Sequence, residues 1–289
     1  KMYKDKNITL VSFATLDLKR SISRFKTQAI NSNYYDQIKI FTPEDLEDSD
    51  KKKIEIFLRQ GKRRGFAYWY WKPLLLIDIL KKIKDNDIIQ YLDIGFHINK
   101  TLSNRFYEYL DLLNQEETNI LAFQYYSLKN NISNDIQFPS REEFKYTKGD
   151  LFKYFNKLND HSITHTPQFS AGNFFIKKNR VTETFLSKWT DIFEKRFDLI
   201  DDTPSSEKNF PGFIENRHDQ SVFSLLCKIN SIKALSAYEF DWAKKNNERT
   251  WSHIINYPFF AKRDLKYNLF KRFLTRQLKT LRRIKKKFL

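Results

Sequence analysis

Short apolar runs alternate with amphipathic stretches along most of the chain. Continuous apolar runs bounded by polar residues are typical of strands buried on both faces, and they occur at residues 8–14, 37–41, 87–93, 119–124 and 169–176. Apolar residues three or four positions apart predict helices over residues 21–30, 72–83, 101–113, 181–197 and 220–229. Pro43-Glu44-Asp45 predicts the first turn of a further helix, because proline fits that turn and acids favour its positive end.

Strands that alternate with helices predict an α/β sheet covered on both faces. No internal repeat and no linker interrupts the pattern before about residue 260, although residues 125–168 are irregular and contain Pro139 and Pro167. We therefore expect one α/β domain over residues 1–260. Ligands of such sheets bind at the carboxyl ends of the strands, so the residues that follow each strand are the first candidates for chemistry.

Composition narrows the class of protein. The 289 residues are 40% hydrophobic, which is too apolar for a disordered chain. The single cysteine, Cys227, excludes a disulfide framework and a cysteine-based zinc site, and favours a reducing compartment. The longest apolar run, residues 74–80, is too short to cross a membrane and contains Asp78.

Positive charge is concentrated in the last residues. The net charge is +17, of which residues 262–289 contribute +11, so the preceding 261 residues carry only +6. Residues 261–289 predict a basic amphipathic helix, which suits the anionic inner face of a plasma membrane. A helix packed on the body with a solvated charged face is the alternative. The basic positions expected to contact the membrane are Lys271, Arg272, Arg276, Lys279, Arg282 and Arg283.

Asp93 ends the third predicted strand, in DIIQYLDIGFHIN (residues 87–99), and Gly95 follows it. A carboxylate in this position can hold a divalent cation or a ribose hydroxyl, and a nearby glycine lets a diphosphate approach the backbone. The alternative is an aspartate that caps a turn.

Two other stretches combine polar and aromatic residues. RGFAYWYWKP (residues 64–73) places two Trp and two Tyr before Lys72, which suits either a stacking wall with a cation for phosphate or an apolar core segment. NRHDQSVFSLL (residues 216–226) places His218, Asp219 and Gln220 before an apolar helix. There Asp219 serves either as a helix cap or as a base, nucleophile or charge stabiliser in a cleft.

Several enzyme classes lack their signatures here. The sequence contains no HxH or HExxH pair, no GxGxxG or Walker loop, and no GxSxG or kinase motif. A tight zinc site, the usual dehydrogenases, P-loop enzymes, serine hydrolases and kinases are therefore disfavoured.

The stretches RGFAYWYWKP, DIIQYLDIG, QFSAGNFFIKKN and NRHDQSVFSLL, in this order, resemble bacterial surface-polysaccharide glycosyltransferases of the GT-A type. The resemblance covers residues 8 to 253. It implies a GT-A-like (Rossmann-like) mixed sheet flanked by helices, and an enzyme that transfers a hexose from a nucleotide sugar, with a UDP-sugar favoured. The implied acceptor is a glycan or lipid-linked glycan of capsule, O-antigen or lipooligosaccharide at the cytoplasmic membrane face.

The resemblance also assigns residues. Asp93 matches the first carboxylate of the DxD motif, which contacts the nucleotide sugar and its metal, while Gly95 stands where the last Asp would be and leaves the need for Mn²⁺ or Mg²⁺ open. Asp219 matches the carboxylate near the reaction centre, and His253 is the candidate for a late-chain metal ligand. The remaining residues implied to bind the donor are Thr15, Trp69, Trp71, Lys72, Gly172, His218 and Gln220.

Two other functions stay open on the sequence. A nucleic-acid-binding protein could use the basic tail on phosphates and the aromatic residues for base stacking, although the concentration of charge in the tail argues against it. A membrane-associated scaffold with a degenerate enzyme fold is favoured by the incomplete DxD motif. Binding of a sugar nucleotide distinguishes the transferase from both.

Overall fold

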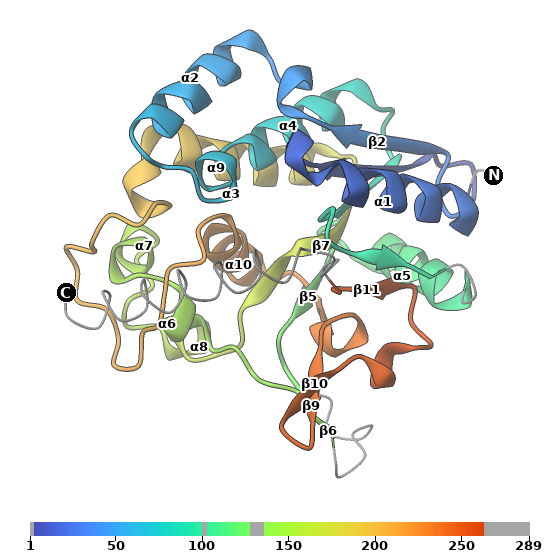
Figure 1. Ribbon diagram of the computed structural model, residues 1–289. Coiled ribbons are helices and arrows are strands. Elements are labelled where there is room, and N and C mark those ends of the chain that lie inside the picture. Colours follow the sequence, from blue (N-terminus) through green and yellow to red (C-terminus); the bar gives the residue numbers. More distant parts are fainter. Residues whose placement is uncertain (1–2, 100–102, 128–135, 263–289) are drawn as a thin grey trace.

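The computed structural model describes residues 3–99, 103–127 and 136–262. Its centre is a six-stranded mixed sheet in the order β2-β1-β3-β7-β5-β8 (Figure 1). The strands are β1 (Ile8–Phe13), β2 (Gln37–Phe41), β3 (Ile88–Leu92), β5 (Ile120–Gln124), β7 (Phe169–Lys177) and β8 (Ala234–Ser236).

One strand of this sheet runs against the others. β1 pairs in parallel with β2 and β3, and β5 pairs in parallel with β8, whereas β7 is antiparallel to both β3 and β5. The C-terminal ends of the other five strands therefore lie at the same edge as the beginning of β7. We call this edge the C-terminal edge of the sheet.

Helices cover both faces of the sheet. Apolar side chains of α4 (Trp71–Lys82), α9 (Arg180–Lys195) and α10 (Asp219–Ile229) form one buried cluster with the strands. Those of α1 (Lys19–Ser32) and α5 (Ser103–Gln115) form a second cluster on the other face. Alternate strand residues enter opposite clusters, as Ile89 and Tyr91 enter the first while Ile88 and Leu92 enter the second. The predicted α/β class, a mixed sheet flanked by helices, is confirmed.

Smaller elements complete the described residues. Short strands form two further sheets, one of β10, β9 and β6 and one of β11 and β4. Their bounds are β4 (His97–Ile98), β6 (Ile136–Gln137), β9 (Ala243–Lys245), β10 (Glu248–Thr250) and β11 (Phe259–Phe260). The other helices are α2 (Asp48–Arg59), α3 (Gly65–Tyr68), α6 (Glu143–Tyr146), α7 (Gly149–Tyr154) and α8 (His161–Thr164), with 3-10 turns at Leu16–Leu18, Pro43–Asp45, Phe197–Leu199, Ala237–Glu239 and Ser252–Ile254.

Two sequence expectations differ from the structure. Pro43–Asp45 is a separate 3-10 turn and not the start of a helix, because Thr42 and Asp45 close a reciprocal capping box and Leu46 is already extended. Helix α2 begins only at Asp48. The region after β5, expected to be irregular, contains α6, α7 and α8, whose four to six residues are too few to show a helical period.

The predicted basic helix of residues 261–289, with its six membrane-contact positions, lies almost entirely outside the described residues. Among the residues that the structure does describe, none of the helices is both long enough and apolar enough to span a bilayer.

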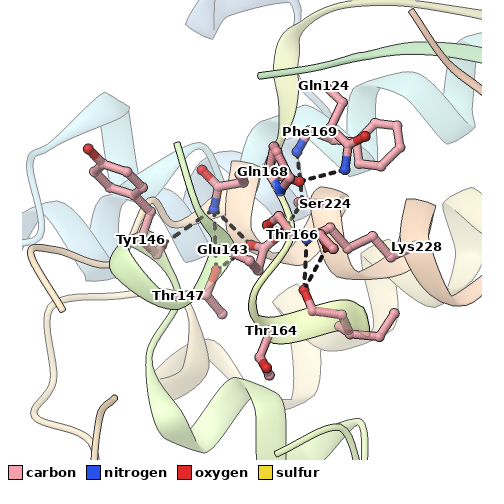
Figure 2. Close-up of polar contacts among 12 residues, drawn as sticks. Gln124, Glu143, Tyr146, Thr147, Thr164, Thr166, Gln168, Phe169, Ser224 and Lys228 are labelled. Atoms are coloured by element: carbon pink, nitrogen blue, oxygen red, sulfur yellow. Dashed lines mark hydrogen bonds and ion pairs between the residues drawn. The ribbon is translucent and has the colours of Figure 1, made fainter. Parts of the chain in front are cut away.

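A buried polar centre joins α6, α10 and the start of β7 (Figure 2). Glu143 is fully buried, and its carboxylate accepts hydrogen bonds from Ser224 and, at 2.6 Å and 2.9 Å, from Thr147 and Gln168. Lys228 forms an ion pair with it at 2.8 Å and donates to the carbonyl oxygens of Ile163 and Thr166. Every polar group of this centre is therefore partnered, which is the condition under which a buried charge is tolerated.

Candidate active site

The chain enters α4 through a left-handed turn. Gly65 and the four residues that follow it, Phe66 to Trp69, all have φ between 53° and 63°. Residues with a side chain pay about 1–2 kcal/mol each for this conformation. At Gly65 a Cβ atom would lie 2.3 Å from the Trp69 ring, so only glycine fits. Strain of this kind gathers at functional sites, where the surroundings hold it in place.

The turn delivers Lys72, in the first turn of α4, into the interior. Its side chain is only 2% exposed, and its ammonium lies 2.5 Å from Oδ2 of Asp219 and 3.7 Å from Oδ1 of Asp93. Asp219 is the first residue of α10 and Asp93 directly follows β3. The structure thus brings together three of the residues predicted for the site, from three separate elements. Lys72 is therefore buried and is not a solvated residue at the start of α4.

A break in the register of β7 accommodates this ammonium. β5 pairs with β7 up to Ala122–Phe174 and resumes at Phe123–Ser170, so Ala171, Gly172 and Asn173 have no partner in β5. Irregularities of this kind are common beside active sites because they redirect backbone groups. The carbonyl oxygen of Ala171 accepts a hydrogen bond from Lys72 at 3.2 Å.

Gly172 lies against Asp93. Its carbonyl oxygen accepts a hydrogen bond from the Asp93 amide at 2.9 Å, and a Cβ atom on Gly172 would lie 2.9 Å from Oδ2 of Asp93. Any larger residue would push the carboxylate aside. Gly172 therefore leaves room for the Asp93 carboxylate, while its implied contact with the donor sugar or the acceptor stays a prediction.

Tyr91 holds the other oxygen of Asp93. Its hydroxyl donates to Oδ1 at 2.7 Å, and the Lys72 ammonium lies 4.7 Å from the centre of its ring. The Asp93 side chain remains 41% exposed, whereas that of Asp219 is 7% exposed. The site therefore presents one fixed carboxylate to solvent and keeps a second one inside.

Burial and charge shift the protonation of the inner pair. Burial raises the pKa of Asp219 to about 6, although Lys72 acts to lower it. Burial also lowers the pKa of Lys72, but Asp219 and Asp93 outweigh this, so its pKa lies above the ordinary value. At neutral pH the cluster consists of one ammonium and two carboxylates and carries a net charge of −1.

His218 precedes Asp219 and is buried. Its φ of 56° and ψ of −118° are unusual for a residue with a side chain. Nδ1 lies 2.6 Å from the carbonyl oxygen of Ile200, so this nitrogen carries the proton. Nε2 has no hydrogen-bond partner among the residues that the structure describes. Burial lowers the pKa of His218 to about 4, which leaves the ring neutral. The ring packs against Tyr68 and Trp69 of the left-handed turn.

Gln220 connects the site to the buried polar centre. Its side-chain amide donates at 2.6 Å to the side-chain oxygen of Gln168. The Gln168 side-chain amide in turn donates to Glu143 (Figure 2). A rigid centre thereby fixes the first turn of α10 and with it Asp219.

The other residues implied to bind the donor occupy different surroundings. Trp71 is 4% exposed and stacks on Phe13 at 3.9 Å between ring centres, so it is a core residue. Trp69 is the more accessible of the two tryptophans. Thr15 is half-buried and follows β1 at the C-terminal edge. Gly95 lies in the tight turn closed by the hydrogen bond from the Phe96 amide to the Asp93 carbonyl.

The predicted metal ligands do not gather in the described part of the chain. His253 packs on the Tyr238 ring, and its Nε2 lies 3.0 Å from the carbonyl oxygen of Asp241. No group of three His, Cys, Asp or Glu side chains suitable for a metal ion occurs among the described residues. Asp93 is the one predicted ligand with an accessible carboxylate, and a single carboxylate suffices for Mg²⁺ when substrate phosphates supply further oxygens.

Sequence reasoning missed two contributors. Tyr91 lies two positions before Asp93. Because strand side chains alternate between faces, residues two apart share a face, and this rule would have identified Tyr91 as a neighbour of Asp93. The Ala171 carbonyl carries no signal in the sequence, because it depends on the register break in β7.

No known family model matches the chain, and no curated protein matches it. Among solved structures the chain is similar to three glycosyltransferases. They are the apo-form GlyE of Streptococcus pneumoniae TIGR4 (16% identity, 81% of this chain and 46% of that chain, TM-score 0.36), mouse xyloside xylosyltransferase 1 (8%, 81% and 86%, 0.37) and the galactosyltransferase LgtC in complex with donor and acceptor sugar analogs (11%, 81% and 75%, 0.37). The chain spans just under half the length of the GlyE structure. At these TM-scores we draw no mechanism or substrate from the likeness.

Proposed function

We propose that the protein is a glycosyltransferase that moves a hexose from a nucleotide sugar, with a UDP-sugar favoured, to a glycan acceptor. The observation that carries this proposal is the cluster of Lys72, Asp93 and Asp219 at the C-terminal edge of the sheet. The sequence resemblance suggested these three residues separately, and the fold makes them neighbours.

The charge of the cluster suits the chemistry of glycosyl transfer. Departure of a diphosphate leaves positive charge at the anomeric carbon and ring oxygen in an oxocarbenium-like transition state. A buried site with a net charge of −1 favours that positive charge, and the fixed positions of its groups avoid reorganisation during the reaction. We infer that Asp219 stabilises this charge or takes the proton of the acceptor hydroxyl.

Asp93 is suited to hold the donor. Its exposed carboxylate can accept hydrogen bonds from donor hydroxyls, with Tyr91 and Gly172 fixing its orientation. It is also the residue that would hold Mn²⁺ or Mg²⁺, which would supply positive charge to the departing diphosphate. Trp69 offers an aromatic face beside the same edge.

Donor binding tests the proposal. Thermal unfolding would be followed with UDP-, GDP-, dTDP- and CMP-sugars, with and without Mn²⁺, and a ligand at a hundred times its Kd stabilises by about 2.7 kcal/mol. We expect one nucleotide class to stabilise the wild type and the Asp78→Asn control but not Asp93→Asn. Asp78 is a matched control because it lies on α4 with a side-chain exposure of 40%, close to the 41% of Asp93.

Equal stabilisation of all three forms would remove Asp93 from the donor site. The outcome that contradicts the proposal is a folded protein that responds to no donor. The membrane-associated scaffold then becomes the better explanation. A response that requires Mn²⁺ and disappears in Asp93→Asn assigns the metal to that carboxylate.

We also propose that the acceptor is a surface glycan at the cytoplasmic membrane face, on the support of the net charge of +11 in residues 262–289. The test is sedimentation of the full chain with vesicles. The wild type should sediment with vesicles that contain anionic lipid. This binding should disappear in a variant in which six basic residues are changed to Gln: Lys271, Arg272, Arg276, Lys279, Arg282 and Arg283. Equal binding to neutral vesicles would contradict the proposal.

A further inference from the structure

Arg217 lies two residues before Asp219 and is poorly paired. Its guanidinium stacks 3.9 Å from the centre of the Tyr146 ring, and the side chain is 22% exposed. Its one ion pair in the described structure is with Glu215 at 3.9 Å, and Glu215 is shared with Arg64 at 3.3 Å. Within the described residues no hydrogen bond is made by the five N–H donors of this side chain, which is unusual for a largely buried guanidinium.

A second guanidinium lies nearby. Arg141 stacks 3.9 Å from the centre of the Tyr125 ring, is 12% exposed and forms an ion pair with Asp241 at 2.7 Å. Burial lowers the pKa of Arg217, and the positive charge of Arg141 lowers it further. The two guanidinium groups are therefore close enough to repel each other. Asp241 neutralises Arg141, whereas Arg217 has no comparably close acid among the described residues.

Three arginines of this region share two acids through their ion pairs. The cations are Arg64, Arg141 and Arg217, and the anions are Glu215 and Asp241. Holding uncompensated like charges away from water costs free energy. An anion placed against Arg217 would offset this cost, and the planar fork of a guanidinium matches the two oxygens of a carboxylate or phosphate.

Backbone contacts tie both arginines to the reaction site. The Gln168 amide donates to the Arg141 carbonyl at 2.7 Å, and the Arg217 amide donates to the Tyr146 carbonyl at 3.0 Å. Gln168 accepts a hydrogen bond from the side chain of Gln220, the residue that follows Asp219. Gln168 directly precedes β7, and Gly172 lies in it, so at most roughly 13 Å of backbone, at about 3.3 Å per residue, separates this framework from the glycine beside Asp93.

The arginines lie on the other side of β7 from Asp93. Tyr125 follows β5, whose last residue pairs with Phe169, whereas Asp93 follows β3. A donor held by Asp93 would therefore approach along β3, and a group against Arg217 would approach along β5. Asp219 follows Arg217 by two residues and pairs with Lys72, which also lies 3.7 Å from Asp93, so Asp219 connects the two approaches.

We propose that Arg217, supported by Arg141, binds an anionic group, a carboxylate or a phosphoester, of the saccharide that receives the sugar. This proposal rests on the proposed glycosyl transfer and adds the chemical class of the acceptor: an acidic glycan. Arg217 donates bidentate hydrogen bonds to the anion, and Arg141 contributes positive charge while remaining paired with Asp241.

The test is a set of titrations with glucose, glucuronate, glucose 6-phosphate and UDP, followed by NMR. The proteins are the wild type, Arg217→Gln, Arg217→Lys and the control Arg59→Gln, which removes the same charge from an 82% exposed position on α2. Melting temperatures establish that each variant is folded, and Arg217→Lys keeps the charge while removing the fork.

We expect a charged sugar to bind the wild type at least tenfold more tightly than glucose, with an affinity that falls as salt rises. Arg217→Gln should lose about ten- to hundredfold of this affinity, because hydrogen bonds to charged groups are the strong ones, and Arg217→Lys should lose less. Arg59→Gln should stay within twofold. The tighter of glucuronate and glucose 6-phosphate identifies the anion as carboxylate or phosphoester.

Equal binding of charged and uncharged sugars, or no binding of either, overturns the proposal. A parallel loss of UDP affinity in Arg217→Gln also overturns it, since the arginine would then serve the donor diphosphate. Failure of UDP to bind any form, with Arg217-dependent binding of a charged sugar intact, refutes the transferase and leaves the anion site standing.

Discussion

The two ends of α10 each take part in a buried lysine–carboxylate pair, and the pairs differ in how completely they are satisfied. Near the C-terminal end, Lys228 meets Glu143, and every donor and acceptor around them has a partner. At the N-terminal end, Asp219 pairs with Lys72, and the half-exposed carboxylate of Asp93 lies 3.7 Å from the same ammonium. The first pair is closed and structural, whereas the second keeps an unbalanced negative charge facing solvent.

This difference shows how a protein can separate rigidity from reactivity on one helix. Acids favour the N-terminus of a helix and cations its C-terminus, so α10 places both charges where its dipole stabilises them. The closed pair fixes the helix through Gln168 and Gln220. The open pair keeps a second carboxylate, that of Asp93, beside it and exposed to solvent.

Removal of the inner carboxylate should have the largest effect. In Asp219→Asn we expect the rate of sugar transfer to fall about 10²- to 10⁴-fold, the range lost with a positioned acid or base. The measurement is release of nucleoside diphosphate from the donor class found by thermal unfolding. Circular dichroism controls for folding, and a rate within tenfold of wild type would assign Asp219 to structure alone.

Disruption of the closed pair should act on stability instead. Glu143→Ala leaves the Lys228 ammonium buried without its carboxylate, which should lower the free energy of unfolding by about 3–5 kcal/mol. Urea titration measures this value. The comparison variant Asp93→Asn, at the open pair, should change it by less than about 1 kcal/mol because that side chain is half-exposed. Similar losses in both variants would remove the distinction between the pairs.

The open pair should also respond to pH. Burial raises the pKa of Asp219 from 3.8 to about 6. Between these two pH values the Asp219 carboxyl is therefore mostly protonated in the folded protein and mostly ionised in the unfolded chain. The free energy of unfolding should therefore decrease as pH rises through this window, by about 3 kcal/mol in total at 1.36 kcal/mol per pKa unit. The transfer rate should increase over the same window as the carboxylate forms.

Urea titrations and rate measurements at several pH values check that stability falls while the transfer rate rises. Asp219→Asn should flatten the stability difference between pH 4 and 6 relative to wild type. An unchanged pH dependence in that variant would show that another group titrates.

The smallest effect concerns the left-handed turn beside the open pair. Ala67→Gly should change stability by less than about 0.5 kcal/mol, because relief of the left-handed strain offsets the entropy cost of glycine. The matched change Ala29→Gly, at an equally buried position in α1, should cost about 1–2 kcal/mol. Thermal unfolding compares the two, and equal costs would contradict the strain argument.

The main elements of the fold were predictable because each is long enough to show its period. The expected strands at residues 37–41 and 119–124 and the helix at 72–83 agree with the observed ones within a residue. Elements α6, α7 and α8 were not predicted, because four to six residues contain too little periodicity. The 3-10 turn at Pro43–Asp45 was mistaken for a helix start because both share the same capping residues.

The site was predictable only as a collection of residue types. Asp93, Lys72 and Asp219 were identified by their places at a strand end and at helix starts. Their mutual distances were not predictable, since they depend on the antiparallel direction of β7 and its register break. The core position of Trp71 against Phe13 was equally open, because an aromatic residue suits a core and a stacking wall alike.

The sequence by itself determined the α/β class, the order of the main elements and the candidate chemical groups, because these follow from local periodicity and residue type. Only the tertiary structure decided that one lysine lies between two carboxylates and that Glu143 and Lys228 form a closed pair. It also decided that, within the described residues, the side chain of Arg217 makes no hydrogen bond and one long ion pair. Burial sets these properties because it removes the water that would otherwise solvate each charge. The free energy of a buried charge then depends on the groups packed around it.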